Sequence, residues 1–349
     1  MFYYAPERRR RSALAASSAN EAMNTVYSRE GKCRYLGSLY ATGGEGAIYP
    51  LLERADLLVK IYHAQVLEKR GELLQDKVLM MCEQQHHRNN GRLAWPLIPV
   101  YDAYRRWIGY AMYRRQGVPM AKLAHAMLYE RHFPGLDRRR VTGYLLNLLR
   151  TIRELHDGGV MLGDCNLRNI LCDPSSEEIS LIDCDSFQVE LGEWVYTCPV
   201  GFPDMTPEEH HGQDFSLVVR TQESEAFSIA IVLFMALMLG RHPYDVQGGG
   251  ERAENLRRAS FPYGVGNSGI PAGRWYNIWS HMPYRLKALF IRTLVEGAHD
   301  PRKRATLAEW INAIEQYRKE IDKGYHEVAM EPTAPKSRTY RGSGRAQST

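Results

Sequence analysis

The sequence of 349 residues contains few cysteines, and no two of them form a C-x-x-C motif. Six cysteines in a chain of this length are too sparse for a disulfide framework. We therefore expect reduced thiols and a cytoplasmic protein. The cysteines are Cys33, Cys82, Cys165, Cys172, Cys184 and Cys198.

Long apolar runs are also absent. The longest one, residues 227–240 (FSIAIVLFMALMLG), has 14 residues, whereas a membrane-spanning helix needs about 20. It predicts a buried helix of a globular domain, and we expect no association with a membrane. Residues 1–11 (MFYYAPERRRR) place a basic run after the aromatic side chains with no apolar stretch behind it, so we expect no secretory leader.

Charge of one sign is not in large excess. The chain has 45 Lys and Arg against 40 Asp and Glu, which gives a net charge of +5. This balance neither favours nor excludes a nucleic acid or nucleotide partner. The content of 44% hydrophobic and 24% charged residues is typical of a globular protein with a sizeable core.

The two ends of the chain differ in composition from the interior. Residues 1–30 are rich in Arg, Ser and Ala, and residues 325–349 are polar and contain Pro, Gly and Ser without periodicity. We expect a flexible basic segment at 1–30 and a disordered tail at 325–349. The run Arg8–Arg11 could bind phosphates, but it is more typical of a solvated tail.

The interior changes its pattern once. Residues 33–115 contain short strand-like runs, such as CRYLGSLY, DLLVKIY and WIGYAMY, and one helical stretch at 64–82. Residues 121–317 have a mostly helical pattern. This predicts an α+β fold with two lobes, a small β-rich lobe at 31–115 and a larger helical lobe at 116–324, with a ligand cleft between them.

A glycine-rich segment lies between two of the strand-like runs. In Thr42-Gly43-Gly44-Glu45-Gly46, glycine allows backbone N–H groups to reach phosphate oxygens. The apolar strand that follows contains Lys60, and a lysine there is costly to bury unless it meets an anion. An exposed lysine on an edge strand remains the alternative. A second glycine-rich segment, residues 264–269, is followed by Ile-Pro rather than a helix, and we expect it to be a plain loop.

Polar residues interrupt two apolar strands after the helical pattern that ends RELHDGG. Asp164 and Asn169 lie in LGDCNLRNIL, and Asp183 lies in ISLIDCDSF. Asx turns in a hairpin explain each of them. The alternative is a carboxylate that takes a proton, together with an amide and a second carboxylate that hold Mg²⁺ through oxygen.

In this order and at these separations, the segments between residues 33 and 322 resemble the protein kinase fold. The resemblance implies that the glycine-rich loop covers the phosphates of ATP and that Lys60 pairs with the α- and β-phosphates. Asp164 matches the catalytic aspartate, and Asn169 and Asp183 match the ligands of Mg²⁺, with Mn²⁺ as a possible substitute. The implied adenine site includes a hinge near Met112–Arg115, and the full set of implied ATP-binding residues is Thr42, Gly43, Gly44, Glu45, Gly46, Ile48, Leu58, Lys60, Met112, Tyr113, Arg115 and Leu171.

Several short segments indicate a narrower family within the protein kinases. GGEGAIY, VKIYH, LIDCDSFQV and LMLGRHPYD are similar to a bacterial family of stand-alone kinases associated with tellurium-resistance-type gene clusters. That family implies Ser/Thr acceptors and action beside a von Willebrand A-type protein and a metal-dependent phosphatase. Some of its members carry a helix-hairpin-helix extension. We find no such motif in this sequence, so we do not expect nucleic acid binding.

The segment VGFPDMTPE looks like the end of a kinase activation segment and favours a protein substrate. The resemblance pairs Glu208 with Arg304. Gly163 stands where an arginine usually precedes the catalytic aspartate, so activity should not need a phosphate on the activation segment. Tyr196 and Thr197 are therefore not expected to be switch sites.

Two further departures concern the substrate side of the site. Asn166 and Phe202 replace two residues that usually meet at the catalytic aspartate. Arg168, four residues after Asp164, could supply the missing positive charge, and we include it among the catalytic residues.

The acidic partner of Lys60 has no clean match. Glu68, Glu72 and Asp76 all lie on the predicted helix, and Glu72 or Asp76 is the expected partner. Asp185, two residues after the expected metal ligand, could be a further ligand, although we favour a turn residue. Three cysteines lie in the two polar segments and in the expected activation segment. We expect their thiols to be buried and inert rather than redox-active. They are Cys165, Cys184 and Cys198.

These features predict an ATP- and Mg²⁺-dependent protein kinase that transfers the γ-phosphoryl group to a protein hydroxyl, with Ser or Thr favoured. The first alternative is a pseudokinase scaffold that binds nucleotide and regulates a partner, and the missing arginine supports it. The second is a small-molecule phosphotransferase of the same fold, and the activation-segment match argues against it.

Overall fold

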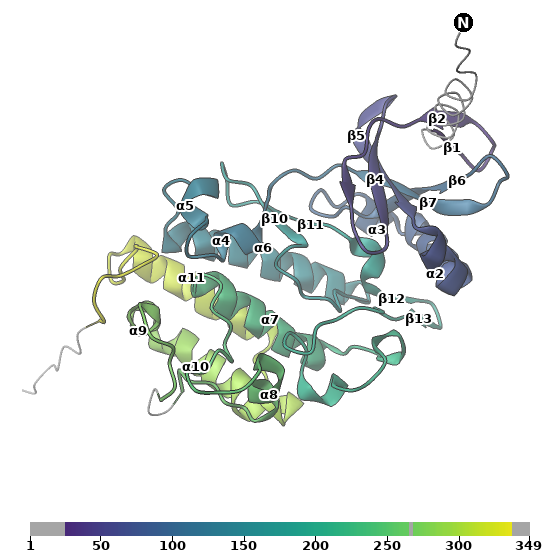
Figure 1. Ribbon diagram of the computed structural model, residues 1–349. Helices are drawn as coiled ribbons and strands as arrows, with labels where there is room; N and C mark the ends of the chain where they lie inside the picture. The colour runs from purple at the N-terminus through teal and green to yellow at the C-terminus, as the bar shows by residue number, and fades with distance from the viewer. Residues whose placement is uncertain (1–24, 265–267, 337–349) are drawn as a thin grey trace, which may run out of the picture. The chain divides into compact units, whose positions relative to one another are not determined.

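The computed structural model describes residues 25–264 and 268–336. Residues 1–24 and 337–349 of the expected end segments lie outside the described residues, as do residues 265–267 of the second glycine-rich segment. The described chain divides into two compact units (Figure 1). The first unit contains the chain up to Gln116 together with residues 180–185 and 191–196, and the second contains the rest.

The first unit consists mainly of β-strands, as the sequence predicts. Its strands are β1 (Thr25–Tyr27), β2 (Cys33–Tyr35), β3 (Ala41–Thr42), β4 (Gly46–Leu51), β5 (Arg54–Tyr62), β6 (Pro96–Tyr101), β7 (Trp107–Tyr113) and β13 (Trp194–Tyr196), and its helices are α2 (Ala64–Glu83) and α3 (Gln85–Arg88). Strand β1 corrects the expected flexible segment at 1–30, because residues 25–27 pair with β2 in an antiparallel ladder.

Strands β1 to β7 form one antiparallel sheet in the order β2-β1-β6-β7-β5-β4-β3. Side chains alternate between the two faces of a strand. Leu58 and Tyr62 of β5 therefore lie on one face and belong to one apolar cluster, while Leu57 and Val59 belong to another. By the same alternation, Lys60 faces the cluster that contains Leu58 and Tyr62.

Helix α2 covers this same face of the sheet and contacts β6 and β7. Its buried residues recur at helical spacing, which is the pattern of an amphipathic helix packed on a sheet. Leu74, Val78 and Cys82 contribute to the apolar cluster around Tyr62 and Tyr110. The helix thus buries apolar side chains against the strand that carries Lys60.

A short segment from later in the chain joins the first unit through backbone hydrogen bonds. Leu181 forms a parallel bridge with Leu93, the Ala94 N–H donates to the Leu181 carbonyl at 2.9 Å, and the Leu181 N–H donates to the Arg92 carbonyl at 2.7 Å. This attachment fixes the backbone immediately before Asp183.

The second unit is mostly helical, as expected. Its α-helices are α4 (Met120–Leu123), α5 (Tyr129–His132), α6 (Arg138–Asp157), α7 (Gln222–Leu237), α8 (Arg252–Arg257), α9 (Trp275–Ser280), α10 (Tyr284–Leu294) and α11 (Leu307–Asp322). Its short strands are β8 (Val118–Pro119), β9 (Val160–Met161) and β10 (Ile170–Cys172), and its 3₁₀ helices are η2 (Glu208–His210), η3 (Phe215–Leu217), η4 (Glu296–Ala298) and η5 (Pro301–Lys303). Three elements contain residues of both units: β11 (Ile179–Leu181), η1 (Cys184–Ser186) and β12 (Gln188–Leu191).

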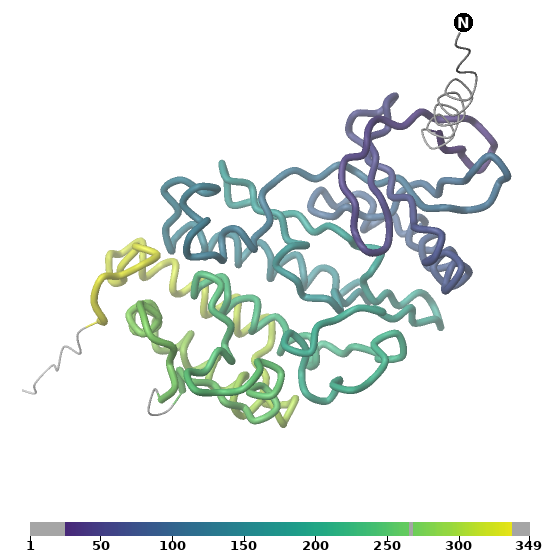
Figure 2. Tube along the Cα trace, in the orientation of Figure 1, coloured from purple at the N-terminus to yellow at the C-terminus, as the bar shows by residue number. Residues whose placement is uncertain are grey.

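Helix α7 is the buried helix that the apolar run predicts. It begins with a capping box between Thr221 and Ser224 and is buried along nearly its whole length. Helices α6 and α11 pack against each other in the same unit (Figure 2).

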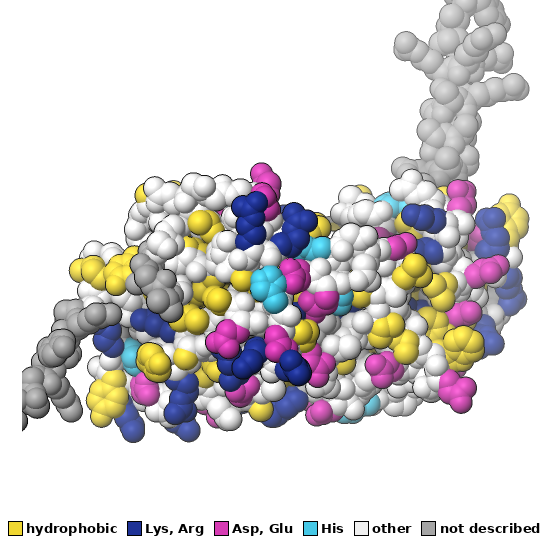
Figure 3. Space-filling view, turned by 90° about the horizontal axis from the view of Figure 1, so that it is seen from below, with side chains coloured by type: hydrophobic (Ala, Val, Ile, Leu, Met, Phe, Trp, Pro, Cys, Tyr) yellow, Lys and Arg dark blue, Asp and Glu magenta, His cyan; other side chains and the backbone are white. Residues whose placement is uncertain are grey.

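One face of the molecule is mixed in charge, in line with the near balance of the sequence. On the face shown in Figure 3, Lys and Arg side chains lie among Asp and Glu side chains. Within residues 25–264 and 268–336, no helix combines the length and the apolar character needed to cross a bilayer.

The expected disordered tail is corrected for residues 325–336. The backbone N–H of Arg138 donates to the Val328 carbonyl, and its Nε donates to the Ala329 carbonyl, both at 2.9 Å. The Met330 side chain is buried. Composition alone did not reveal this, because the segment is held by backbone carbonyls and a single apolar side chain.

We expect Arg138→Met to lower the free energy of unfolding by about 3 kcal/mol, because a buried guanidinium and the carbonyls that it satisfies lose their hydrogen bonds. The neighbouring Arg139 is a matched control, since its side chain is 45% exposed and pairs with Asp322. Arg139→Met should cost less than about 1 kcal/mol. Chemical denaturation of both variants measures the difference, and equal costs would contradict the role given to Arg138.

Candidate functional site

The Lys60 ammonium lies inside the first unit among carboxylates. The residue is 5% exposed, and its Nζ lies 2.7 Å from Oδ1 of Asp183 and 2.9 and 2.7 Å from the two carboxylate oxygens of Asp185. Glu45 from the glycine-rich loop lies 3.7 Å from the same Nζ. Burial favours the neutral amine, but these carboxylates raise the pKa of Lys60 above its ordinary value. The alternative of an exposed edge lysine is therefore excluded.

Asp185 is the most enclosed of these carboxylates. The Tyr62 hydroxyl donates to its Oδ2 at 2.5 Å, and the Tyr110 hydroxyl donates to its Oδ1 at 2.7 Å. Tyr110 lies directly opposite Lys60 in the pairing of β5 with β7. Burial alone would raise the pKa of Asp185, but the ammonium and the two hydroxyls outweigh it and lower the pKa to about 2. The sequence interpretation as a mere turn residue is wrong for the side chain, although the backbone does turn there in η1.

Asp183 differs from Asp185 in exposure and backbone conformation. Its side chain is 42% exposed, and its φ of 61° lies in the left-handed region that non-glycine residues rarely adopt. Burial raises the pKa of Asp183 despite the neighbouring ammonium. The two carboxylates that pair with Lys60 therefore differ in exposure, with Asp185 enclosed and Asp183 partly open to solvent.

The acids of α2 do not reach Lys60. Glu68, Glu72 and Asp76 are exposed, and the ion pairs of Lys60 are with Asp183, Asp185 and Glu45. The expected pair with Glu72 or Asp76 is therefore wrong. The physical reason is that α2 turns its apolar stripe toward the sheet, so its acids project to solvent.

The glycine-rich loop joins β3 to β4 and is tied to the start of α2. The Gly43 N–H donates to the Gly46 carbonyl, and the His63 N–H donates to the Glu45 carbonyl, both at 2.9 Å. A Cβ at Gly46 would lie 2.4 Å from the Ile61 carbonyl oxygen, so packing requires glycine there. At Gly43 and Gly44, an added Cβ would meet no described heavy atom within 4 Å, and neither residue has a positive φ. Neither packing nor backbone conformation therefore requires glycine at these two positions.

Sequence reasoning missed an ion pair between this loop and α2. Glu45 accepts a hydrogen bond from the Arg70 guanidinium. It also missed the tyrosines on Asp185, although Tyr62 occupies the next position of β5 on the same face as Lys60, and strand periodicity could have identified it.

The residues expected around adenine lie in both units. In the first, Leu58 pairs with Met112 across β5 and β7, and Ile48 packs against their cluster. Tyr113 ends β7 and is exposed at its edge. The Nε of Arg115 donates to the Leu93 carbonyl at 2.8 Å, so part of its guanidinium is hydrogen-bonded to the backbone. In the second unit, Leu171 lies on β10 and pairs with Pro119 of β8.

The expected catalytic residues lie in one tight segment of the second unit, between β9 and β10. The Asn166 N–H donates to the Asp164 carbonyl, and the Asn169 N–H donates to the Asn166 carbonyl, both at 2.9 Å. The Asn166 side chain accepts from the Arg168 N–H at 3.0 Å, which explains an asparagine at this position. Asp164 and Asn169 are half-buried, and Arg168 is exposed.

A buried acid on α7 holds this segment. Glu225 accepts from the Gly163 N–H at 2.7 Å, and its other oxygen lies 2.6 Å from Nε2 of His156 on α6. Gly163 has a φ of 70°, and an added Cβ would lie 2.3 Å from the Cβ of Cys198. Packing therefore excludes the usual arginine. Sequence reasoning missed Glu225, although an acid next to an apolar run indicates a buried carboxylate with a partner.

The activation-segment region is fixed by a buried arginine. The Arg220 guanidinium donates to the carbonyls of Cys198, Val200 and Val218, each at 3.1 Å. The Thr197 hydroxyl donates to the Ser216 carbonyl at 2.5 Å. The positive charge that holds this region therefore comes from an arginine of the chain itself.

The predicted pair of Glu208 with Arg304 is wrong by one residue. Arg304 donates to the two carboxylate oxygens of Glu209 at 2.6 and 2.9 Å. Glu208 instead lies 2.6 Å from Nδ1 of His299. Both glutamates belong to η2, so adjacent positions point in different directions, and sequence alone cannot choose between them.

The three thiols expected to be inert are buried. Burial raises the pKa of the Cys165 and Cys184 thiols above the ordinary value. A protonated buried thiol is a poor nucleophile.

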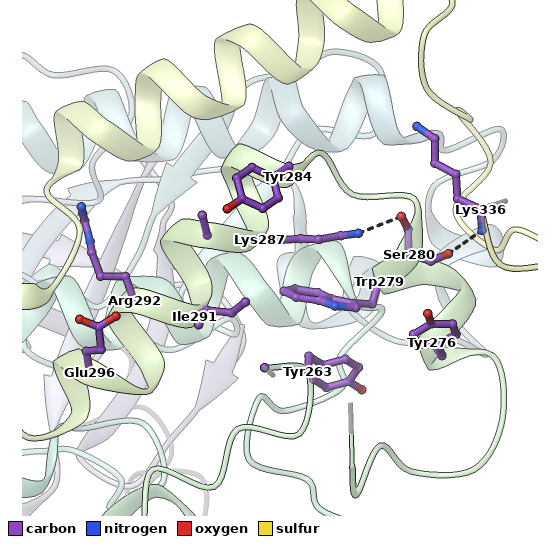
Figure 4. Close-up of a pocket in the computed structure, with 12 residues that line it drawn as sticks. Tyr263, Tyr276, Trp279, Ser280, Tyr284, Lys287, Ile291, Arg292, Glu296 and Lys336 are labelled. Atoms are coloured by element: carbon purple, nitrogen blue, oxygen red, sulfur yellow. Dashed lines mark hydrogen bonds between the residues drawn. The ribbon is translucent and has the colours of Figure 1, made fainter. Parts of the chain in front are cut away.

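The second unit also contains a cavity of about 650 Å³ (Figure 4). Tyr263, Trp279 and Tyr284 line it, and the Lys287 ammonium donates to the Ser280 carbonyl at 2.9 Å. Burial lowers the pKa of Lys287 to about 8. Among the described residues that line it, none is predicted to bind ATP or metal or to act in catalysis.

We expect Glu209→Gln to lower the free energy of unfolding by about 1–3 kcal/mol, because the buried Arg304 loses its charged partner. Arg304 holds the pKa of Glu209 below its ordinary value of 4.5, against the effect of burial. The stabilisation is therefore complete above pH 4.5 and is lost as the pH falls through the lower folded-state value. Glu208→Gln is the matched control, and denaturation curves should separate the two variants at pH 7 and separate them less as the pH falls below 4.5. A larger loss for Glu208→Gln would contradict the pairing.

Comparisons with known proteins give relatives of kinase type. No protein family model matches the chain. It is similar to "Protein kinase YegI" of Escherichia coli O157:H7, 26% identical over 310 residues, and of Escherichia coli strain K12, 26% identical over 309 residues. These matches cover 86% and 85% of this chain but 47% of each relative. The chain therefore spans about half the length of the curated relatives it matches.

A solved structure shows the fold. The crystal structure of a rhoptry kinase from Toxoplasma gondii matches with a TM-score of 0.57 and 12% sequence identity, over 86% of this chain and 84% of that chain. The α+β prediction is confirmed: the chain has a bilobal protein kinase-like fold, with a β-rich and a helical part.

Proposed function

We propose that this chain is an ATP- and Mg²⁺-dependent protein kinase that transfers the γ-phosphoryl group to a Ser or Thr hydroxyl of a protein. The observation that carries the proposal is the buried Lys60 ammonium, paired with two aspartates and 3.7 Å from the glycine-rich loop residue Glu45. The protein kinase names of the Escherichia coli relatives support it.

The chain's own residues would divide the work of phosphoryl transfer. Lys60 donates to phosphate oxygens, and the N–H groups of the glycine-rich loop cover them. Asp164 accepts the proton of the acceptor hydroxyl as its oxygen forms a bond to the γ-phosphorus, and the bond from that phosphorus to the oxygen of ADP breaks. Arg168 is exposed and screens the developing negative charge.

The donor atoms of Asn169 and Asp183 fit Mg²⁺, and Mn²⁺ would take the same ligands. Mg²⁺ prefers oxygen and is held in such sites by one or two side chains together with substrate phosphates. Asp183 offers a carboxylate that is 42% exposed. Among residues 25–264 and 268–336, no group of three His, Cys, Asp or Glu side chains could hold a metal by itself. When bound, the ion would neutralise phosphate charge.

The acceptor is proposed to be a protein. The region held by Arg220 leaves apolar side chains exposed, with Phe202 at 49% and Leu217 at 79%. Such a surface suits a polypeptide better than a small polar acceptor. By the family resemblance, we also propose a cytoplasmic setting encoded in a tellurium-resistance-type gene cluster, with a von Willebrand A-type protein and a metal-dependent phosphatase as partners.

The alternative is a pseudokinase scaffold. Gly163 in place of the usual arginine favours it, because that arginine is common in active kinases. The two candidates differ in transfer and agree in nucleotide binding, so both quantities must be measured on the same protein.

We expect Asp164→Asn to reduce phosphoryl transfer from labelled Mg-ATP to the chain itself, or to casein as a generic acceptor, by about 10²–10⁴-fold, since the proton acceptor is lost. Its affinity for Mg-ATP should stay unchanged. Asp157→Asn, at the exposed end of α6, is the control and should transfer at the wild-type rate. Wild-type protein that binds Mg-ATP yet transfers no more label than Asp164→Asn would favour the scaffold.

A further inference from the structure

Three carboxylate oxygens accept hydrogen bonds from the Lys60 ammonium, which has three N–H donors. One oxygen belongs to Asp183 and two belong to Asp185. A lysine that must also bind a phosphate needs at least one of these partners to be exchangeable and another to be permanent. Asp183 and Asp185 differ in exposure and in hydrogen bonding, as an exchangeable partner and a permanent partner should.

Asp185 has the properties of the permanent partner. Its side chain is 1% exposed, and each oxygen accepts from Lys60 and from one tyrosine hydroxyl. Tyr62 comes from β5 and Tyr110 from β7, so the carboxylate is fixed by two strands of the same sheet. Asp183 is the more exposed of the two and contacts Lys60 through a single hydrogen bond.

The backbone that carries Asp185 is attached to the segment that leads into β6. The bridge between Leu181 and Leu93 fixes it upstream. The Cys184 thiol closes the turn by donating to the Leu181 carbonyl at 3.5 Å. The acids of α2, in contrast, are exposed.

We propose that Asp185 is the positioning residue that holds Lys60 for the nucleotide phosphates, so that the lysine is oriented without an acid from α2. This inference rests on the proposed nucleotide site. It assigns to a residue of the late segment the role that the kinase resemblance predicts for Glu72 or Asp76.

The test measures binding of Mg-ATP and of adenosine to the full chain by calorimetry. Adenosine lacks phosphates, so it reports the base site alone. Asp185→Asn should weaken Mg-ATP about tenfold, the effect of losing a hydrogen bond to a charged group, and leave adenosine unchanged. A variant with Glu68→Gln, Glu72→Gln and Asp76→Asn combined should bind both ligands as the wild type does.

A double-mutant cycle shows whether Asp185 acts through Lys60. In a Lys60→Met background, adding Asp185→Asn should cause no further loss of Mg-ATP affinity, because the group that it positions is gone. If Asp185→Asn does not fold, the pair Tyr62→Phe and Tyr110→Phe removes the two hydroxyls and keeps the aromatic rings. That variant should weaken Mg-ATP about fivefold and leave adenosine unchanged.

Three results would overturn the inference: equal weakening of adenosine and Mg-ATP, a loss of Mg-ATP affinity in the α2 variant with none in Asp185→Asn, or no Mg-ATP binding by the wild type. The binding data also separate this inference from the proposed function. A chain that shows the expected binding pattern but no phosphoryl transfer would refute the kinase activity and retain the role of Asp185.

Discussion

A buried ammonium has to be matched by carboxylates, and the first unit is organised around meeting that need for Lys60. Strand alternation places the lysine on the face of β5 that packs under α2, where the neighbouring side chains are apolar. The match comes from a segment more than a hundred residues later, which the Leu181 bridge attaches to the unit. Asp185 and Asp183 then share the ammonium, and two tyrosine hydroxyls complete the hydrogen bonds of Asp185. An isolated buried lysine would lose its charge, whereas this one is held in the charged form that a phosphate needs.

The second unit also contains buried charged side chains, and these hold nearby backbone by hydrogen bonds. Glu225 holds the segment of the expected catalytic aspartate by its backbone, and Arg220 holds the activation-segment region by its carbonyls. Gly163 precedes the expected catalytic aspartate, and packing against Cys198 leaves no room there for a side chain. Arg220 donates directly to backbone carbonyls of this region, so these contacts form without a phosphate.

The sequence was sufficient to predict the fold class, and it was insufficient to predict which charged side chains pair. The change from strand to helix patterns predicted the α+β architecture, and the apolar run predicted α7. Two predicted ion pairs were wrong for the same reason. Helical and 3₁₀ spacing offered several acids as partners of one cation, and only side-chain packing decides which acid reaches it. Glu72 and Asp76 point to solvent because α2 buries its other face, and Glu209 rather than Glu208 meets Arg304. Residues 325–336 were misjudged because backbone carbonyls, which composition does not record, hold them to Arg138.

The measurement that tests the central claim most directly is a crystal structure of the full chain with Mg²⁺ and a non-hydrolysable ATP analogue. The account predicts that Lys60 keeps both hydrogen bonds to Asp185, gives up the one to Asp183 and donates to a phosphate oxygen, with the α2 acids still directed to solvent. A structure in which Lys60 leaves Asp185 and pairs with Glu68, Glu72 or Asp76 would contradict it.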